Sequence, residues 1–245
     1  EGMGLAVKTA TIFPGNTNSA INGGVNLFSD RNGTLEALID FHLVTKWKTA
    51  ADSLLAARRL ARPDSRSILI LGAGSVAASM VEAYRAVFPK ADIQIWNRSP
   101  EGAQALAARC GELAVDDLPA AVGQADIIAC ATMATDPVLL GEWLSPGVHI
   151  DLIGAYRPDM READDTVLKR GRVFVDSRDT TLDHIGELKI PLAEGVISPS
   201  DIVADYYDLD RFQRGSDVEI TVCKNGGGAH LDLMTCRYIL EAVGA

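Results

Sequence analysis

The sequence predicts an α/β fold with a parallel sheet covered by helices, joined to a smaller α+β domain. In the middle of the chain, short apolar segments alternate with stretches of helical periodicity, which is typical of parallel strands with crossover helices. The two ends of the chain lack that alternation, which indicates a separate smaller unit. The apolar segments are residues 68–71, 93–96, 113–115, 127–130, 148–152 and 173–175.

The N-terminal part of the chain predicts a small antiparallel sheet followed by a long helix. Three strands are expected, at residues 5–13, 25–28 and 35–39. Asn32-Gly33 is a hairpin signal between the second and third strands. Residues 41–61 have helical spacing, with Asp40 placed as the N-cap and Pro63 just beyond the last turn.

The C-terminal part is expected to pack back on this small unit. Residues 218–223 predict a strand and 229–243 a helix. We therefore expect residues 1–62 with 216–245 to form a discontinuous smaller domain. The larger domain, residues 63–215, is then inserted into it.

A glycine motif predicts what the larger domain binds. Gly72-x-Gly74-x-x-Ala77 follows the first apolar strand and opens a helix. In a Rossmann fold the first glycine permits the tight turn, the second lets the backbone approach a pyrophosphate, and Ala77 allows close packing. The helix N-terminus offers free N–H groups to phosphates. The expected contacts to a dinucleotide are Gly72, Ala73, Gly74, Ser75 and Val76; the alternative is a glycine-rich turn that binds nothing or another ligand.

The second strand of the larger domain bears on the choice of cofactor. It ends in Asn97-Arg98-Ser99 and lacks the acidic residue that binds a ribose 2′-hydroxyl. All three residues are candidate cofactor contacts, and the pattern favours NADP(H) over NAD(H), which stays possible. Arg98 is alternatively a solvated surface charge. Ala131 and Thr132 end a strand where ribose and nicotinamide lie in open sheets, or are ordinary strand-end packing.

Composition excludes several classes of function. A formal net charge of -10 disfavours a nucleic-acid partner, because binding phosphates needs a basic face. No apolar run is long enough for a membrane span and no export signal is recognisable, so we expect a cytoplasmic protein without a membrane partner. The four cysteines form no CxxC pair, and the spacing of His42, His149 and His184 is not typical of a metal site.

Several further motifs occur in a fixed order along nearly the whole chain. They are Val7-Lys8 with Phe13-Pro14-x-Asn16, Lys48-Thr49-Ala50-Ala51, the glycine turn, Ile153-Gly154-Ala155-Tyr156-Arg157-Pro158-Asp159, Val175-Asp176-Ser177 and Lys224-Asn225-Gly226-Gly227. In this order they resemble the ornithine cyclodeaminase/μ-crystallin family. The resemblance implies a Rossmann domain, a dimer-forming α+β domain and hydride exchange with a nicotinamide. It also implies an N-terminal segment, upstream of this numbering, that carries an arginine for the substrate carboxylate.

The resemblance assigns roles to two lysines. Lys8 matches the family's active-site lysine, which faces the substrate carboxylate and the reacting carbon; its alternative is a strand lysine in solvent. Lys48 stands where the family generally has an arginine, and a lysine binds a carboxylate as a point charge without the planar fork. Its alternative is an i+4 pair with Asp52. Thr49 is a cofactor contact by the same resemblance.

Two further segments complete the expected site. Tyr156 stands where cyclodeaminases have an aspartate, and a phenol is a poor general base at neutral pH, which favours a reductase; Asp151 or Asp159 would supply a carboxylate instead. By resemblance, Asn225, Gly226 and Gly227 pass the nicotinamide. His230 is a candidate proton donor or a solvated side chain.

The predicted function is reduction of a small α-imino acid or cyclic ketimine to an L-amino acid by NAD(P)H. Iminosuccinate, pyrroline-2-carboxylate and piperideine-2-carboxylate fit this outline. The alternatives are an ornithine-like, ammonia-releasing cyclodeaminase and a non-catalytic nucleotide-binding protein of the crystallin kind. A homodimer is the family expectation.

Overall fold

The computed structural model describes residues 2–13 and 21–244, and the chain divides into two compact units. Unit 1 comprises Glu1–Thr49 with Gly227–Ala245, and unit 2 comprises Ala50–Gly226. The Pro14-x-Asn16 part of the first family motif lies outside the described residues. No helix in the described ranges has the length and apolar character that crossing a membrane requires.

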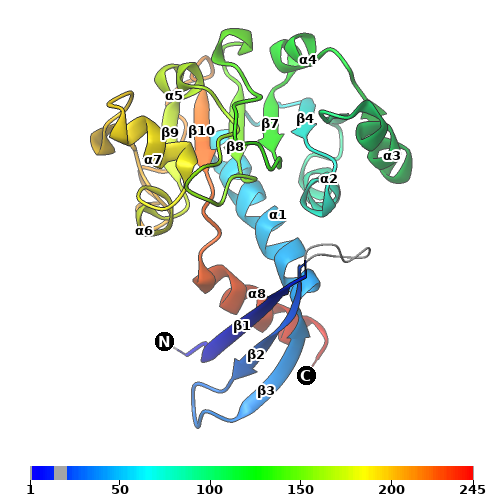
Figure 1. The fold of residues 1–245 in the computed structure, drawn as a ribbon, viewed down its shortest axis with the longest axis vertical. Coiled ribbons are helices and arrows are strands. Elements are labelled where there is room, and N and C mark those ends of the chain that lie inside the picture. The colour runs from blue at the N-terminus through cyan, green and yellow to red at the C-terminus, as the bar shows by residue number, and fades with distance from the viewer. Residues whose placement is uncertain (1, 14–20, 245) are drawn as a thin grey trace. The chain divides into compact units, whose positions relative to one another are not determined.

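Unit 2 confirms the predicted α/β fold. Its seven parallel strands lie in the order β6-β5-β4-β7-β8-β10-β9, and β4, β7, β8 and β10 stand side by side in Figure 1. The chain starts at the centre and winds outward both ways, as in dinucleotide-binding sheets. The strands are β4 (Ser67–Leu71), β5 (Asp92–Trp96), β6 (Leu113–Ala114), β7 (Ile127–Cys130), β8 (His149–Leu152), β9 (Arg172–Val175) and β10 (Thr221–Lys224).

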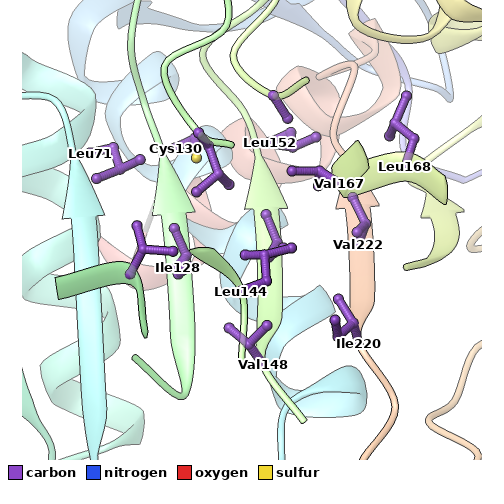
Figure 2. Close-up of a cluster of buried hydrophobic side chains, with 14 of the residues drawn as sticks. Leu71, Ile128, Cys130, Leu144, Val148, Leu152, Val167, Leu168, Ile220 and Val222 are labelled. Carbon is purple, nitrogen blue, oxygen red and sulfur yellow. The ribbon is translucent and has the colours of Figure 1, made fainter. Parts of the chain in front are cut away.

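Helices cover both faces of this sheet, and apolar side chains of its strands pack on both sides. Ile68 and Ile70 pack on one side with Met80 of α2, whereas Leu69 and Leu71 belong to the core of the other side. Figure 2 shows this second core, where side chains of β4, β7, β8 and β10 gather. The helices of unit 2 are α2 (Ser75–Val87), α3 (Pro100–Cys110), α4 (Leu118–Gln124), α5 (Asp165–Arg170), α6 (Arg178–Thr181) and α7 (Gly186–Ala193).

Unit 1 is an antiparallel sheet with one covered face. Its strands are β1 (Leu5–Ile12), β2 (Ile21–Phe28) and β3 (Leu35–Asp40), in the order β1-β2-β3. Val25, Leu27 and Ile39 share a core with Val44 of α1 (Phe41–Leu60) and Cys236 of α8 (Ala229–Ala242). Lys8 pairs with Val25 across the strands and therefore lies on this covered face.

Two details of the N-terminal prediction are confirmed and one C-terminal prediction is wrong. The Asp40 carboxylate accepts a hydrogen bond of 2.9 Å from the Leu43 N–H, so Asp40 does cap α1. Gly33 has a φ of 71° in the turn between β2 and β3. In contrast, β10 does not pack on the small unit. It inserts between β8 and β9 of the large sheet, where its side chains are buried on both faces.

The unit boundaries consequently differ from the expected ones. Residues 50–62 and 216–226, which we assigned to the smaller domain, lie in unit 2. The second half of α1 supplies Ala56 and Leu60 to a core with Phe174 of β9 and Cys223 of β10. The boundary between the two units is therefore set by how the strands and helices pack. No linker signal in the sequence marks it.

A polar cluster is buried within unit 2 beside this helix. Asp52 of α1 is 4% exposed, and the side chains of Asn225 and Tyr206 lie close enough to its carboxyl to act on its pKa. Burial, together with the charge of Asp176, raises the pKa of Asp52 to about 8. Nearby, Asp151 accepts a hydrogen bond of 2.6 Å from the Tyr84 hydroxyl. The unit therefore carries a carboxyl group that is protonated near neutral pH.

Asp52→Asn is expected to flatten the pH dependence of stability. Because the folded chain binds this proton more tightly than an unfolded aspartate does, the contribution of Asp52 to stability is present at low pH and is lost as the pH rises toward about 8. In urea titrations, wild-type stability should fall relative to the variant by up to about 1.4 kcal/mol per pH unit between about pH 4 and pH 8. The exposed Asp210→Asn is the control; parallel curves for wild type and Asp52→Asn would contradict the assignment.

Candidate functional site

The glycine turn between β4 and α2 has the geometry of a phosphate-binding loop. Gly72 has a φ of 118°, and a Cβ there would lie 2.6 Å from the carbonyl oxygen of Ala131. Gly74 has an ordinary φ of -80°, and a Cβ there would meet nothing within 4 Å. Ala77 is fully buried, as its packing role requires. Gly72 is thus needed for the turn, while Gly74 borders open space at the N-terminus of α2.

The N-terminus of α2 offers its backbone donors without competition from a cap. No side chain among the described residues caps the helix, whose N-cap is Gly74 itself. Ser75 is exposed, and Ala73 and Val76 are half-buried. Free N–H groups and the positive end of the helix dipole are what a pyrophosphate binds.

Residues after β5 present a cation to solvent at the same edge of the sheet. Arg98 is exposed and makes no hydrogen bond or ion pair with the described residues, and Ser99 is exposed beside it. The Asn97 amide is held by hydrogen bonds of 3.1 Å to the carbonyl and hydroxyl of Ser99. No acidic side chain stands at residues 97–99, and the nearest one along the chain is Glu101 in the first turn of α3.

The loops after β7 and β8 are joined by a buried carboxylate that the sequence analysis did not single out. One oxygen of Glu162 accepts hydrogen bonds from the Thr132 N–H and hydroxyl, and the other accepts from the N–H groups of Gly154 and Ala155. Glu162 is fully buried. It stands in the charged run Arg161-Glu-Ala-Asp-Asp165, which resembles an exposed surface and gives no signal of burial.

Asn225 follows β10, and its amide lies close enough to the buried Asp52 carboxyl to lower the pKa of that group against the larger effect of burial. Its side chain is 2% exposed. Gly226 lies against Thr180, whose hydroxyl would be 2.8 Å from an added Cβ. Gly227, with a φ of 68°, begins the return of the chain into unit 1. These glycines are required by close packing and by the turn before α8.

In unit 1, two lysines converge on one carboxylate. The Lys8 ammonium donates hydrogen bonds of 2.9 Å to Asp232 and 3.0 Å to the Thr45 hydroxyl, and lies 4.4 Å from the centre of the Phe41 ring. The Lys48 ammonium donates to the other oxygen of Asp232 at 3.2 Å and to the Gly227 carbonyl at 2.5 Å. The side chain of Lys8 is 22% exposed, that of Lys48 is 11% exposed and that of Asp232 is 10% exposed.

This arrangement decides between the alternatives for both lysines. Lys8 is not a solvent-facing strand lysine, and the pair of Lys48 with Asp52 is not formed. Two cations against one anion leave a net positive charge in a largely buried position. Asp232 was missed, although an acidic residue in the first turn of a predicted helix after three glycines was a usable signal.

The remaining candidates are less closely held. Tyr156 is 54% exposed, and His230 and Thr49 are half-buried without a side-chain hydrogen bond to another described residue. Neither carboxylate proposed as a substitute lies free beside Tyr156. Asp151 is fully buried against Tyr84 and His149, and Asp159 is paired with Arg157, whose hydrogen bonds lower the pKa of that carboxyl.

No group of three or more His, Cys, Asp or Glu side chains in the described ranges has the arrangement of a metal site. His149 is buried and bonded to Thr221 and Asp151, while His42 lies near Asn22. His184 is exposed.

Comparison with known proteins identifies the family. The model of the ornithine cyclodeaminase/mu-crystallin family matches residues 2–245. The chain belongs to this family. Among its relatives, the Delta(1)-pyrroline-2-carboxylate reductase of Paracoccus denitrificans is 53% identical over 255 aligned residues, which cover 99% of this chain and 81% of that protein.

Two solved structures of the family share the fold. The Delta(1)-pyrroline-2-carboxylate reductase of Thermococcus litoralis, in complex with NADH and L-proline, has a TM-score of 0.89 and 29% identity, covering 97% of this chain and 77% of that one. An archaeal alanine dehydrogenase dimer with bound NAD also has a TM-score of 0.89, at 27% identity, covering 96% and 76%. The residues of this chain fit such a dinucleotide, since Gly74 borders open space at the N-terminus of α2, where no side chain of the described residues caps the backbone N–H groups.

The two glycines of the turn are expected to respond differently to alanine. Gly72→Ala should lower the free energy of unfolding by about 2 to 4 kcal/mol, because the Cβ meets a carbonyl oxygen and the backbone is left-handed. Gly74→Ala should lower the free energy of unfolding by no more than about 1 kcal/mol, because alanine is a poorer N-cap than glycine, but weaken NADH and NADPH binding at least about tenfold. Urea unfolding and fluorescence titration measure the two effects. Wild-type affinity in a folded Gly74→Ala variant would argue against a phosphate at this turn.

Proposed function

We propose that this chain is an NAD(P)H-dependent reductase of small cyclic α-imino acids, with Δ1-pyrroline-2-carboxylate as the representative substrate and an L-amino acid as the product. The observation that carries the proposal is the pair of ammonium groups of Lys8 and Lys48 in a largely buried position. Such a pair suits a substrate with a carboxylate. The 53% identity to a reductase of this substrate supports the same reaction.

Lys8 and Lys48 bind the substrate carboxylate in this proposal. Asp232 holds both ammonium groups through separate oxygens, which fixes their positions before substrate arrives. Because each lysine has three N–H donors, each keeps one beyond the two hydrogen bonds that it makes here. A lysine at position 48 replaces the planar fork of an arginine by a point charge, so the orientation of the carboxylate depends on the two lysines together.

The bound dinucleotide supplies a hydride to the imine carbon. Around that step, the chain's own residues orient the carboxylate and deliver a proton to the imine nitrogen. Lys8 is the proposed proton donor, directly or through a water, because its ammonium is held by neutral Thr45 and charged Asp232 on the covered face of the sheet. Tyr156 offers a phenol and no carboxylate, which favours a reductase over a cyclodeaminase.

A homodimer is also proposed, formed through the uncovered face of the unit 1 sheet. Leu5, Val7, Leu35 and Leu38 are 59%, 44%, 58% and 71% exposed, and the strand register places them on the face opposite Lys8. Although the register places Asn26 between Val7 and Leu38, an exposed sheet face with this many large apolar side chains is typical of an interface. The related alanine dehydrogenase is a dimer, and a second copy of the chain is the occupant that we propose.

Lys8→Met should lower kcat/KM for Δ1-pyrroline-2-carboxylate at least about 100-fold, since it removes a cation that binds the substrate carboxylate and donates the proton. Lys48→Arg should retain activity within about tenfold, because it restores the residue type that the family generally has. Oxidation of NADPH and NADH at 340 nm measures both. The exposed Lys90→Met is the control. Full activity of Lys8→Met would refute the assignment, and release of ammonia from ornithine without net NAD(P)H oxidation would favour a cyclodeaminase.

NADP(H) is the proposed preferred cofactor, with Arg98 as the residue that binds the 2′-phosphate. Arg98→Ala should weaken NADPH binding about tenfold and leave NADH binding within about twofold, since only NADPH carries that charge. Titration calorimetry with both dinucleotides decides the point. Equal affinities of the wild type for the two, unaltered by the substitution, would assign Arg98 to the surface.

Leu38→Asp should shift the proposed dimer toward the monomer, because it places a charge in the apolar face. Light scattering during size-exclusion chromatography gives the mass of each form. The exposed Leu113→Asp, on β6 of unit 2, is the matched control. A dimer that is unaffected by Leu38→Asp would move the interface elsewhere.

A further inference from the structure

Glu162 is a buried anion whose bonding goes beyond what packing of the core requires. Its four acceptor contacts all come from two loops that leave neighbouring parallel strands at the same edge of the sheet. The distances are 2.7 Å to the Thr132 N–H, 2.8 Å to its hydroxyl, 2.7 Å to the Gly154 N–H and 3.2 Å to the Ala155 N–H. A carboxylate is the side chain that can accept at both ends.

The two loops are also in direct backbone contact. A Cβ on Gly154 would lie 2.1 Å from the Thr132 carbonyl oxygen and 2.4 Å from its nitrogen. The loop after β7 in turn touches the glycine turn, because a Cβ on Gly72 would meet the Ala131 carbonyl oxygen. Small displacements of either loop are therefore transmitted to the others at this edge.

Two further buried ionisable side chains hold this region in place: Glu187 binds the backbone of Glu162 and Ala163, and Lys224 binds the end of β8 and the loop after it. Both oxygens of Glu187 accept backbone N–H groups, from Glu162 at 2.7 Å and Ala163 at 3.0 Å. The Lys224 ammonium donates bonds of 2.7 Å to the carbonyls of Leu152 and Ala155. All three charged side chains are fully buried. Burying them is costly, so the arrangement points to a demand for fixed geometry at this edge.

We propose that Glu162 is a positioning residue for the nicotinamide half of the dinucleotide, acting by fixing the loops after β7 and β8. This rests on the proposed cofactor site. In a sheet built from two mononucleotide-binding halves, β4 and β5 receive the adenine half, and the strands on the β7 side receive the other. Glu162 touches neither ligand half itself in this proposal; it sets the backbone that does.

The test compares a whole dinucleotide with its adenine half. Glu162→Gln places an amide NH2 group against the backbone N–H of one loop. The hydrogen bonds from Thr132, or those from Gly154 and Ala155, are then lost. Calorimetric titration should show NADH and NADPH weakened about tenfold or more, with ADP and 2′,5′-ADP within about twofold of wild type. The exposed Glu194→Gln is the charge-matched control.

A second pair of variants keeps the test decisive if Glu162→Gln does not fold. Thr132→Val removes one of the four donors at constant shape, and Thr132→Ser keeps it. The affinity for NADH and NADPH should be at least about threefold lower in the valine variant than in the serine variant, and the affinity for ADP should be equal in both. Equal loss of whole and half ligands, or no loss at all, overturns the proposal.

Failure of the proposed function is distinguishable from failure of this inference. A wild type that binds neither dinucleotide nor ADP overturns both. Selective loss of dinucleotide affinity in Glu162→Gln, without reduction of any imine by wild type, supports the positioning role and rejects the reductase.

Discussion

Parallel pairing of β4, β7 and β8 brings the carboxyl ends of the three strands to one edge of the sheet. The proposed roles of the glycine turn and of the loops after β7 and β8 depend on that register. Gly72, Ala131 and Gly154 follow these strands. A Cβ on Gly72 would meet the carbonyl oxygen of Ala131, and a Cβ on Gly154 would meet the backbone of Thr132. A slip of one residue would exchange the two covered faces and break these contacts.

Buried charge recurs in both units, with different bonding. In unit 1, Asp232 is shared by two ammonium groups whose net charge suits an anionic substrate. In unit 2, Glu162 and Lys224 bind backbone groups and keep loops in place. Burial and the charge of Glu162 raise the pKa of Glu187 to about 7. The shift shows that ionising a carboxyl group in this part of unit 2 is unfavourable.

Most of the fold could be predicted because its signals are local. Apolar strand runs, helical spacing and the glycine turn are properties of neighbouring residues. The capping role of Asp40 is equally local, because its hydrogen-bond partner Leu43 lies only three residues farther along the chain. The place of β10 could not be predicted. Its apolar run is compatible with either sheet, and only tertiary packing between β8 and β9 decides the outcome.

The candidate site divides in the same way. Lys8 and Lys48 were recognisable from motifs. Their common partner Asp232 was not, because it lies 184 positions after Lys48 and no local pattern extends that far. Glu162 was hidden for another reason: charged residues are rarely buried, so a charged run indicates surface. Contacts of this kind arise from topology and not from spacing.

The proposed reaction transfers a hydride from a reduced nicotinamide to the carbon of an α-imino acid. NAD(P)H with deuterium at both C4 positions, incubated with the protein and Δ1-pyrroline-2-carboxylate, tests it directly when the product is examined by mass spectrometry and NMR. The account predicts proline with one deuterium, at the α-carbon, and one cofactor oxidised per product. Proline without deuterium, or cofactor that is bound but never oxidised, would contradict it.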